Sequence, residues 1–242
     1  ISGNVSGDGE NIGGIAGINR STGSLLNYYY HITVSGTGKN VGGAIGLNYG
    51  TVNSNYNNIA SAVAGSTNVG GVIGLQQSSQ TMYSLNNASS VNAAYGYAGG
   101  IIGYAEGSLI LNSAYNSGTV ETGAPLGESG ISASGGIIGS ASSGIKLRGT
   151  DNNGSITAKN GYAGGVAGYL VQNATILISN CNVGKTDINI LGNNVGGILG
   201  YSQSFGLNIS ACTVTGAKLS NYAESDGSMG GITAYNAGDR KS

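Results

Sequence analysis

Short apolar runs, broken by glycine, asparagine and serine, recur along the whole chain. Each repeating unit holds three of them, most clearly Ala98–Tyr104, Ser108–Ser113 and Ser117–Glu121. Runs of this length between turn-forming residues are typical of β-strands. No window of about ten residues has the apolar spacing of a helix. The pattern therefore predicts an all-β chain without helices.

A Gly-Gly-x-x-Gly block recurs within this pattern. It begins at Gly13, Gly42, Gly70, Gly99, Gly135, Gly164 and Gly196, and an eighth copy at Gly230 has Ala234 as its last residue. The first glycines are 29, 28, 29, 36, 29, 32 and 34 residues apart. A short strand cannot bury its apolar face alone, so repeats of this length are typical of stacked solenoid coils. We expect residues 1–242 to form one right-handed parallel β-helix of about eight coils, with three short strands per coil.

Stacking in register turns equivalent positions into columns along the rod. The residue before each glycine pair predicts a buried column of Ile12, Val41, Val69, Ala98, Ser134, Ala163, Val195 and Met229. One place earlier, the column holds Asn11, Asn40, Asn68 and Asn194, with Tyr97 and Tyr162 in other coils. Amides that stack there predict hydrogen bonds along the rod. Counting residues from the blocks predicts one interior column of Tyr115, Asp151, Cys181 and Cys212. We expect the thiols of Cys181 and Cys212 to be buried and free.

Composition narrows the classes of function. The chain has 47 glycines, one proline, 39% hydrophobic residues and a net charge of −1. This composition excludes collagen and fits a disordered chain poorly. Without a basic field, nucleic acid is not an expected partner, and no apolar run predicts membrane insertion. The two cysteines lack metal-ligand spacing, so neither a metal nor another cofactor is expected. The lack of a signal peptide or anchor predicts an interior segment of a longer protein.

The repeated block resembles the GLUG motif of bacterial cell-surface proteins. The unit from Asn40 to Asn53 is especially similar, including Asn48 and Gly50 after the block. The resemblance implies a cell-surface or secreted location and an adhesin-like role, since the family is associated with large secreted or surface-attached proteins, including adhesin-like proteins and non-catalytic regions of some IgA-cleaving peptidases. It supplies no catalytic residues to carry over. The chain departs from the pattern at Ala234 and in the insertion around Pro125.

The sequence does not specify catalytic chemistry, so we do not expect an enzyme. The glycine blocks lack the following helix of a phosphate-binding loop, and a steric role for glycine is simpler. The acids are scattered, although Asp151 is near Lys146 and Arg148. A polysaccharide lyase or glycoside hydrolase on the same fold is the alternative function. An ice-binding protein is a lesser alternative, suggested by Thr33, Ser35, Ser155, Thr157, Thr213 and Thr215.

Tyrosine is the unusual residue, with 15 copies against no tryptophan and one phenylalanine. Tyr169, Tyr201 and Tyr235 directly follow successive blocks, and their rings suit a sugar or a protein ligand. We expect the long connections Glu121–Ser134 and Ser220–Ser228 to border this row. The predicted ligand-binding residues are Tyr169, Tyr201, Tyr235, Glu121, Glu128, Glu224 and Asp226. The alternative interpretation is an aromatic stack that closes a corner of the coil.

The predicted partner is a glycan or a protein of the host or bacterial surface. Adjacent apolar residues inside the blocks, such as Ile101 and Ile102, would point to opposite faces of an extended strand. Only one face of a strand can point inward. The other face predicts an association surface, with lateral self-association through the Gly-Gly-x-x-Gly sheet.

Overall fold

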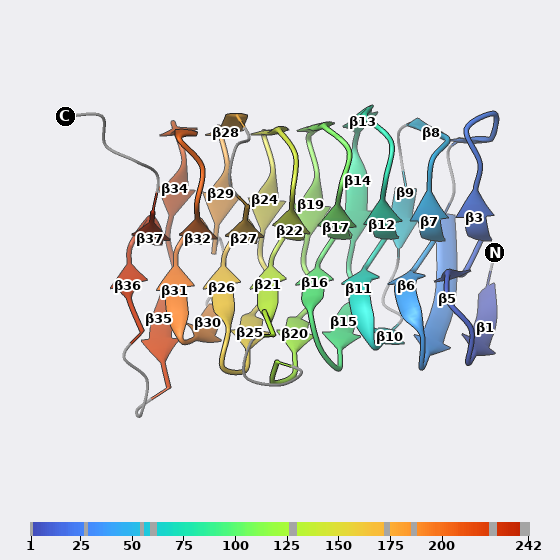
Figure 1. The fold of residues 1–242 in the computed structure, drawn as a ribbon, viewed down its shortest axis with the longest axis horizontal. Coiled ribbons are helices and arrows are strands. Elements are labelled where there is room, and N and C mark those ends of the chain that lie inside the picture. The colour runs from blue at the N-terminus through green and yellow to red at the C-terminus, as the bar shows by residue number, and fades with distance from the viewer. Residues whose placement is uncertain are drawn as a thin grey trace.

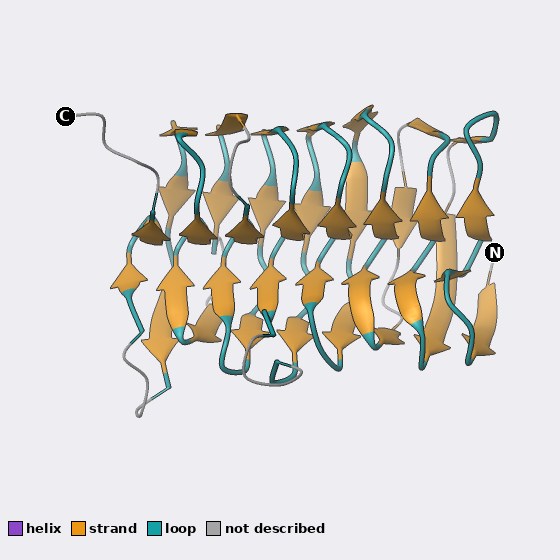
Figure 2. Cartoon of the chain, in the orientation of Figure 1, coloured by secondary structure: helices purple, strands orange, loops and turns teal. Residues whose placement is uncertain are grey.

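The computed structural model describes residues 2–26, 29–53, 56–58, 62–125, 130–171, 175–184, 188–222 and 227–237. These residues form a stack of coils whose strand pairs are all parallel, and none of them forms a helix (Figures 1 and 2). The chain winds in a right-handed sense for about seven turns, from one end of the stack to the other. The predicted right-handed parallel β-helix is confirmed.

The first predicted run of each coil forms two short strands. One ends at the first glycine of the block, and the other begins inside the block and continues beyond its last residue. We call the first set the entry sheet and the second set the exit sheet; each has eight strands. The entry sheet contains β2 (Ile12–Gly13), β6 (Lys39–Gly42), β11 (Thr67–Gly70), β16 (Tyr97–Gly99), β21 (Ala133–Gly135), β26 (Tyr162–Gly164), β31 (Asn194–Gly196) and β36 (Met229–Gly230). The exit sheet contains β3 (Ala16–Asn19), β7 (Ile45–Asn48), β12 (Ile73–Gln76), β17 (Ile102–Ala105), β22 (Ile138–Ala141), β27 (Ala167–Leu170), β32 (Leu199–Ser202) and β37 (Thr233–Asn236).

The second run forms the side sheet, and the rest of the coil belongs to a 14-stranded sheet with two arms. The side sheet contains β13 (Gln80–Tyr83), β18 (Leu109–Asn112), β23 (Ile145–Arg148), β28 (Thr175–Ser179) and β33 (Gly206–Ser210), and the pair β4 (Ser24–Leu26) and β8 (Thr51–Asn53) forms separately. The short arm contains β9 (Tyr56–Asn58), β14 (Leu85–Asn87), β19 (Tyr115–Asn116), β24 (Asp151–Asn152), β29 (Asn182–Val183) and β34 (Thr213–Val214). The flat arm contains β1 (Ser2–Gly7), β5 (Tyr29–Gly36), β10 (Ala62–Gly65), β15 (Ser90–Ala93), β20 (Val120–Thr122), β25 (Ile156–Ala158), β30 (Ile188–Gly192) and β35 (Ala217–Asn221), and β5 joins the two arms.

Glycines of the inner blocks are required because backbone of the same coil and of the neighbouring coil approaches them closely. A Cβ atom on Gly70 would lie 1.9 Å from the carbonyl oxygen of Ile73, in the same block. On Gly71 it would lie 2.1 Å from the carbonyl oxygen of Gly100, in the next coil. The chain bends at this point, and Figure 1 shows each exit strand displaced sideways from its entry strand, toward the preceding coil. These contacts support the steric explanation for the glycines.

The bend also buries both apolar residues of the block. Ile101 and Ile102 are each 0% exposed, as are Ile137 and Ile138 in the next coil. The expectation that one of the two sets faces outward is therefore wrong for these coils, because the block is bent and does not alternate like an extended strand. Lateral self-association through this sheet remains a prediction, without the exposed apolar face that motivated it.

Every first glycine is paired with the first glycine of the neighbouring coil, so the predicted register of the blocks is correct. The predicted buried column is confirmed from Ile12 to Val195, whereas Met229, in the last coil, is 53% exposed. The cysteine column was misplaced by one residue. Tyr115 and Asp151 stack with Asn182 and Thr213, so the residues before them form the column Ala114, Thr150, Cys181 and Cys212.

The two thiols in that column are free, as predicted, but they are not equally buried. The Cys181 Sγ atom is buried 3.1 Å from the Thr150 hydroxyl oxygen. Burial raises the pKa of Cys181 to about 11. Cys212 is only half-buried, because it lies in the next coil toward the C-terminal end.

Amide side chains form hydrogen-bonded ladders along the stack. The predicted ladder is present in the first coils, where Asn40 donates to Asn11 and Asn68 donates to Asn40, each at 2.8 Å. These three asparagines have positive φ angles, a conformation that asparagine tolerates better than most residues. The ladder stops at Tyr97, the residue that follows Asn68 in the column.

Two further ladders lie inside the coil and were not predicted. Asn19 donates to Asn48 and Asn48 donates to Gln76, both at 2.7 Å. On the opposite side of the coil, Asn87 donates to Asn116 at 2.9 Å and Asn116 donates to Asn152 at 2.8 Å, with all three side chains buried. Each amide of the second ladder also donates to the carbonyl two residues further along the chain. The repeat itself therefore supplies hydrogen-bond partners for these buried amides.

Candidate functional site

The predicted tyrosine row is present on the exit sheet. Tyr169 is paired in register with Tyr201, and Tyr201 with Tyr235. The ring centroids are 5.3 and 5.1 Å apart, and the planes are inclined by only 12° and 7°. The three rings thus form a parallel aromatic stack along the rod, with each ring one coil further on.

A fourth ring closes this stack against the glycine block. Tyr162 precedes the block and its ring centroid lies 5.2 Å from that of Tyr169 and 4.8 Å from that of Tyr201. Tyr97 and Tyr104 make the same kind of contact two coils earlier, at 5.0 Å. The paired rings thus come from the two sides of one block and meet outside its strands.

The exposure of the row rises toward the C-terminal end. Tyr169 is 6% exposed, Tyr201 is half-buried and Tyr235 is 46% exposed. The hydroxyl of Tyr169 donates to the Gln203 side-chain oxygen at 3.4 Å, and Gln203 donates to the Tyr201 hydroxyl at the same distance. The geometry agrees with the alternative interpretation of an aromatic stack, and only Tyr235 offers a largely open ring.

Burial and the neighbouring hydroxyls raise the pKa of Tyr169 to about 12. An unfolded tyrosine ionises near its ordinary value of 10, so above that pH the unfolded chain loses this proton first. Tyr169 therefore contributes stability that is present below pH 10 and is lost as the pH rises through 12. We predict that Tyr169→Phe, which cannot ionise, weakens this alkaline loss, measured as the change in unfolding midpoint between neutral pH and pH 11. An unchanged pH dependence would contradict a buried Tyr169 hydroxyl.

Glu121, the one acid of the predicted border within the described residues, does not lie beside the row. Glu121 lies on β20 of the flat arm, where its carboxylate pairs with the Lys159 ammonium at 2.9 Å. Entry strands separate the flat arm from the exit sheet that carries the row. Glu128, Glu224 and Asp226 lie outside the described residues. The long connections join the flat arm to the entry sheet, so they leave the rod before the block, whereas the row follows it.

The base of the first long connection is closed by buried hydroxyls. The Ser132 hydroxyl donates to the Thr122 hydroxyl at 2.8 Å and to the Gly123 carbonyl at 2.7 Å. The Ser134 hydroxyl donates to the Thr157 carbonyl in the next coil, also at 2.7 Å. The insertion therefore departs from and returns to an unbroken stack.

A second group of exposed rings lies on the side sheet and the short arm. Tyr83, the last residue of β13, is 49% exposed, and Tyr115, the first residue of β19, is 37% exposed. The exposed cations Lys146 and Arg148 lie on β23, two coils after Tyr83. We call Tyr83, Tyr115, Lys146 and Arg148 the corner surface. Sequence reasoning missed it because it counted columns only from the glycine blocks.

The corner surface lies on both sides of a backbone turn that recurs in every described coil from β13 onward. The residue after each side-sheet strand has a positive φ angle, which is 50° at Ser84 and 58° at Ser113. The same position is held by Ser84, Ser113, Gly149, Asn180 and Ala211. This left-handed residue turns the chain from the side sheet into the short arm, so outward side chains of the two strands flank one corner.

Polar side chains on the short arm are linked outside the coil as well. Asn182 donates to the Asp151 carboxylate at 2.7 Å, and Thr213 donates to the Asn182 oxygen at 2.6 Å. Asn153 donates to the Tyr115 hydroxyl at 3.3 Å. Asp151, three residues after Arg148 in the sequence, is thus held within an axial polar ladder.

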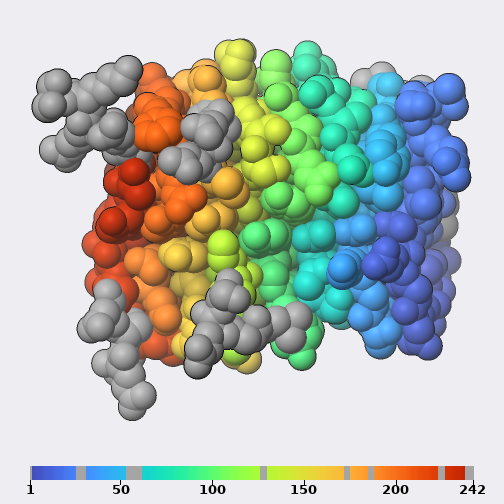
Figure 3. Space-filling view, in the orientation of Figure 1, coloured from blue at the N-terminus to red at the C-terminus, as the bar shows by residue number. Residues whose placement is uncertain are grey.

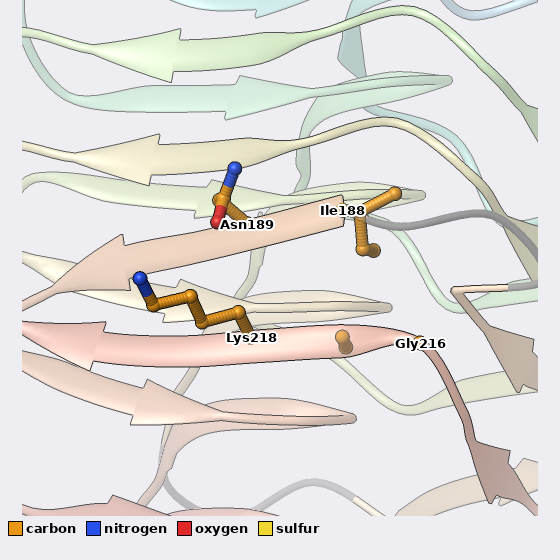
Figure 4. A pocket seen from close by; sticks show the side chains of 5 residues that line it. Ile188, Asn189, Gly216 and Lys218 are labelled. Carbon is orange, nitrogen blue, oxygen red and sulfur yellow. The ribbon is translucent and has the colours of Figure 1, made fainter.

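Two shallow depressions lie on the described surface. One open depression lies between the ends of β30 and β35, lined by Ile188, Asn189, Gly216, Ala217 and Lys218 (Figure 4). Another is lined by Ser6, Gly7, Asp8, Ser35, Gly36 and Thr37. In the space-filling view the coils follow one another as closely packed bands (Figure 3). The predicted threonine array is divided, because Thr33 and Thr157 lie on the flat arm while Thr213 lies on the short arm.

The described ranges contain neither a grouping of metal-ligating side chains nor a membrane-spanning helix. No three His, Cys, Asp or Glu residues gather there in a way that would hold a metal ion. The same residues form no helix long and apolar enough to cross a membrane. Comparison of the chain with protein-family models, with curated proteins and with solved structures found no match.

Proposed function

We propose that the chain is a structural, adhesin-like module of a bacterial cell-surface or secreted protein. The observation that carries this proposal is the continuity of the stack, in which the entry and exit sheets each run through eight parallel strands. The resemblance of the repeated block to the GLUG motif supports the location. A module of this kind acts as a stiff support that holds contact residues at fixed spacing.

Two features support stiffness. Backbone hydrogen bonds join each block to the next, and buried amides such as Asn116 bond to both neighbouring coils. Bending the stack would stretch both sets of bonds at once. Seven steps of about 4.8 Å give an axial length of about 34 Å between the first and last entry strands.

The corner surface is the contact region that we favour for a ligand. Tyr83 and Tyr115 present open rings, while Tyr169 of the predicted row is already covered by its neighbours. A tyrosine ring offers a flat apolar face for a sugar, and the two cations suit a glycan with carboxylate or sulfate groups. Positions in one column are about 4.8 Å apart, so Tyr83 and Arg148 are separated by about 10 Å.

A screen of the purified chain against neutral and acidic glycans tests this proposal. We expect binding to an acidic glycan, with at least a tenfold loss of affinity in the double variant Tyr83→Ala and Tyr115→Ala. The matched control is Tyr49→Ala with Tyr95→Ala, two tyrosines of similar exposure, 38% and 37%, at other corners. The control should bind within about twofold of the unmodified chain. Equal losses in both double variants, or no binding to any glycan or surface protein, would contradict the proposed contact region.

The alternative functions remain predictions that no observation favours. Glu121 and Asp151 lie on different arms, and each already has a partner, Lys159 for the former and Asn182 for the latter. The flat arm carries small outward residues such as Thr33 and Ser90, but the Glu121–Lys159 ion pair interrupts the surface that ice would need to match.

A further inference from the structure

The only two cysteines of the chain occupy consecutive places in one column. The strand pairs β28–β33 and β29–β34 are in register on both sides of them, and in each coil two residues separate the two strands. The residue before each cysteine has a left-handed backbone, with φ angles of 52° at Asn180 and 51° at Ala211. The two turns therefore have the same shape, and Cys181 and Cys212 lie in register, one coil apart.

The two sulfur atoms lie beside the same piece of backbone. The Sγ atom of Cys181 is 3.3 Å from the Ser179 carbonyl oxygen. The Sγ atom of Cys212 is 3.7 Å from the carbonyl oxygen of Ile178, which belongs to the coil that carries Cys181. Burial, with a smaller contribution in the same direction from the Cys212 thiol, raises the pKa of Cys181 to about 11. The two sulfhydryl groups are thus close enough to interact.

The spacing of the coils suits a covalent bond between these sulfurs. Consecutive places of one column have α-carbons about 4.8 Å apart. A disulfide bond requires α-carbons about 4.4 to 6.8 Å apart and Cβ atoms about 3.5 to 4.5 Å apart. The stacking distance meets the first condition, and a small approach of the two Cβ atoms meets the second. Both cysteines lie in the turn between the side sheet and the short arm, so this approach does not require paired strands to move.

We propose that Cys181 and Cys212 are the reduced form of an axial disulfide, which a small-molecule disulfide oxidant forms between two consecutive coils. In the first step the Cys212 thiolate attacks one sulfur of the oxidant, and one small thiolate leaves. The Cys181 thiolate then attacks the Cys212 sulfur of this mixed disulfide, and the second small thiolate leaves. The cysteines lose two protons and two electrons in all, and the oxidant takes up both as it becomes two thiols.

The surroundings of the two thiols determine the order of these steps. Cys212 is half-buried, whereas Cys181 is buried with its sulfur 3.1 Å from the Thr150 hydroxyl oxygen. The thiolate is the nucleophile, and burial disfavours it at Cys181. The oxidant therefore reacts first at Cys212, and Cys181 follows as the resolving thiol. Exposure of Cys212 affects only the rate, because the pairing is determined by the register of the two coils.

The bond joins two coils that otherwise hold together by packing and hydrogen bonds alone. Each coil of a solenoid contacts only its neighbours, so a stack can open coil by coil. A disulfide between residues 31 positions apart opposes the separation of these two coils and restricts the unfolded chain. The inference does not depend on the proposed function. A cell-surface or secreted location would supply the oxidising surroundings in which disulfides persist.

Redox titration of the folded chain in mixtures of oxidised and reduced glutathione tests this inference. Remaining thiols are alkylated in denaturant, and mass spectrometry separates the closed chain, the mixed disulfide and the reduced chain. We expect a monomer that has lost two hydrogen atoms and takes up no alkyl group. Its thermal unfolding midpoint should lie several degrees above that of the reduced chain. In Cys212→Ser no closed chain should form, and the midpoint should not rise on oxidation.

Moving the second cysteine by one residue separates register from proximity along the chain. Cys212→Ala with Thr213→Cys keeps two cysteines but places the second at an exposed position of the short arm. When folded, this variant should need at least about a tenfold higher ratio of oxidised to reduced glutathione for half closure. In denaturant the variant and the unmodified chain should close equally.

Circular dichroism checks that each variant is folded. Cys181→Ala with Asn182→Cys moves the first cysteine in the same way and replaces the Thr213 variant if that one is unfolded. Equal closure of the folded unmodified chain and the folded moved-cysteine variant would overturn the proposal. Products limited to mixed disulfides and intermolecular dimers would overturn it as well.

Discussion

Replacing Gly100 with alanine is expected to destabilise the fold by about 3 kcal/mol or more, one of the largest effects available from a single methyl group. The added Cβ atom would lie 2.1 Å from the carbonyl oxygen of Gly136 and 2.4 Å from the Asn116 side-chain Cγ. The first contact is with backbone of the next coil and the second with a buried ladder. Neither can move without breaking hydrogen bonds, so the clash must be relieved by separating coils. Urea unfolding followed by circular dichroism measures the change.

The chain offers a matched control at the same position of the last block. Gly231→Ala adds the same methyl group where nothing lies within 4 Å. Its free energy of unfolding should change by less than about 0.5 kcal/mol, the usual range for an unconstrained surface position. Similar costs for Gly100→Ala and Gly231→Ala would mean that local backbone conformation, and not the approach of the next coil, requires glycine in the block.

Replacing Asn116 with valine is expected to cost about 2–4 kcal/mol, because it leaves several buried polar groups without partners. Asn116 accepts a hydrogen bond from Asn87 and donates to Asn152 and to the Gly118 carbonyl, at 2.9, 2.8 and 2.8 Å. Valine has a suitable shape, since Val183 and Val214 occupy the same column in later coils. The loss is therefore one of hydrogen bonding, measurable by chemical denaturation.

The ladder also predicts non-additivity. A triple valine variant at Asn87, Asn116 and Asn152 should cost less than the sum of the three single variants, because removing both partners of a bond leaves no orphaned group. Asn92→Ala, an exposed asparagine on the flat arm, should change stability by less than about 0.5 kcal/mol. Strictly additive costs in the triple variant would show that the three amides do not act as a connected ladder.

The fold could be predicted because the repeat constrains every coil in the same way. Seven complete blocks fix the register of the first glycines, and from that register the buried column from Ile12 to Val195 follows directly. Local geometry inside the repeat was harder. An extended strand alternates its faces, so the bend that buries both Ile101 and Ile102 cannot be read from apolar spacing. The cysteine column was displaced for another reason: the number of residues between the block and the side sheet differs between coils, so equal counts from the first glycine reach different positions.

The interior amide ladder shows a second limit of the sequence. Asn87, Asn116 and Asn152 look like turn residues between strands, and asparagine usually is one. The folded coil turns these asparagines inward, toward the glycine blocks. A Cβ atom added to Gly100 would touch the Asn116 side chain. A polar residue that recurs at the same position of successive repeats is the signal for such a ladder. Recognising that position requires the pairing register of the short-arm strands.

The candidate site was predictable only in part. The row of Tyr169, Tyr201 and Tyr235 follows from block position, and its stacking follows from coil spacing. The position of Glu121 relative to this row does not follow from block position, because it depends on which sheet each long connection leaves. Tyr83 and Tyr115 were missed because columns were counted only from the glycine blocks, whereas these rings lie on the two sides of the left-handed turn that follows the side sheet.

The in-register stacking of the coils is tested most directly by distances between spin labels placed in one outward column of the flat arm. Thr33, Thr119, Asn189 and Lys218 are exposed positions of that column, derived from the pairing of their strands. The native thiols are first removed as Cys181→Ala and Cys212→Ala, since Ala114 holds the same place in an earlier coil.

Pairs of labels at Thr33 with each of the other three positions lie three, five and six coils apart. The α-carbon separations should be about 14, 24 and 29 Å, at about 4.8 Å per coil, whatever the number of intervening residues. Separations that fail to increase by equal steps per coil, or a Thr33–Lys218 distance shorter than the Thr33–Thr119 distance, would contradict the parallel solenoid.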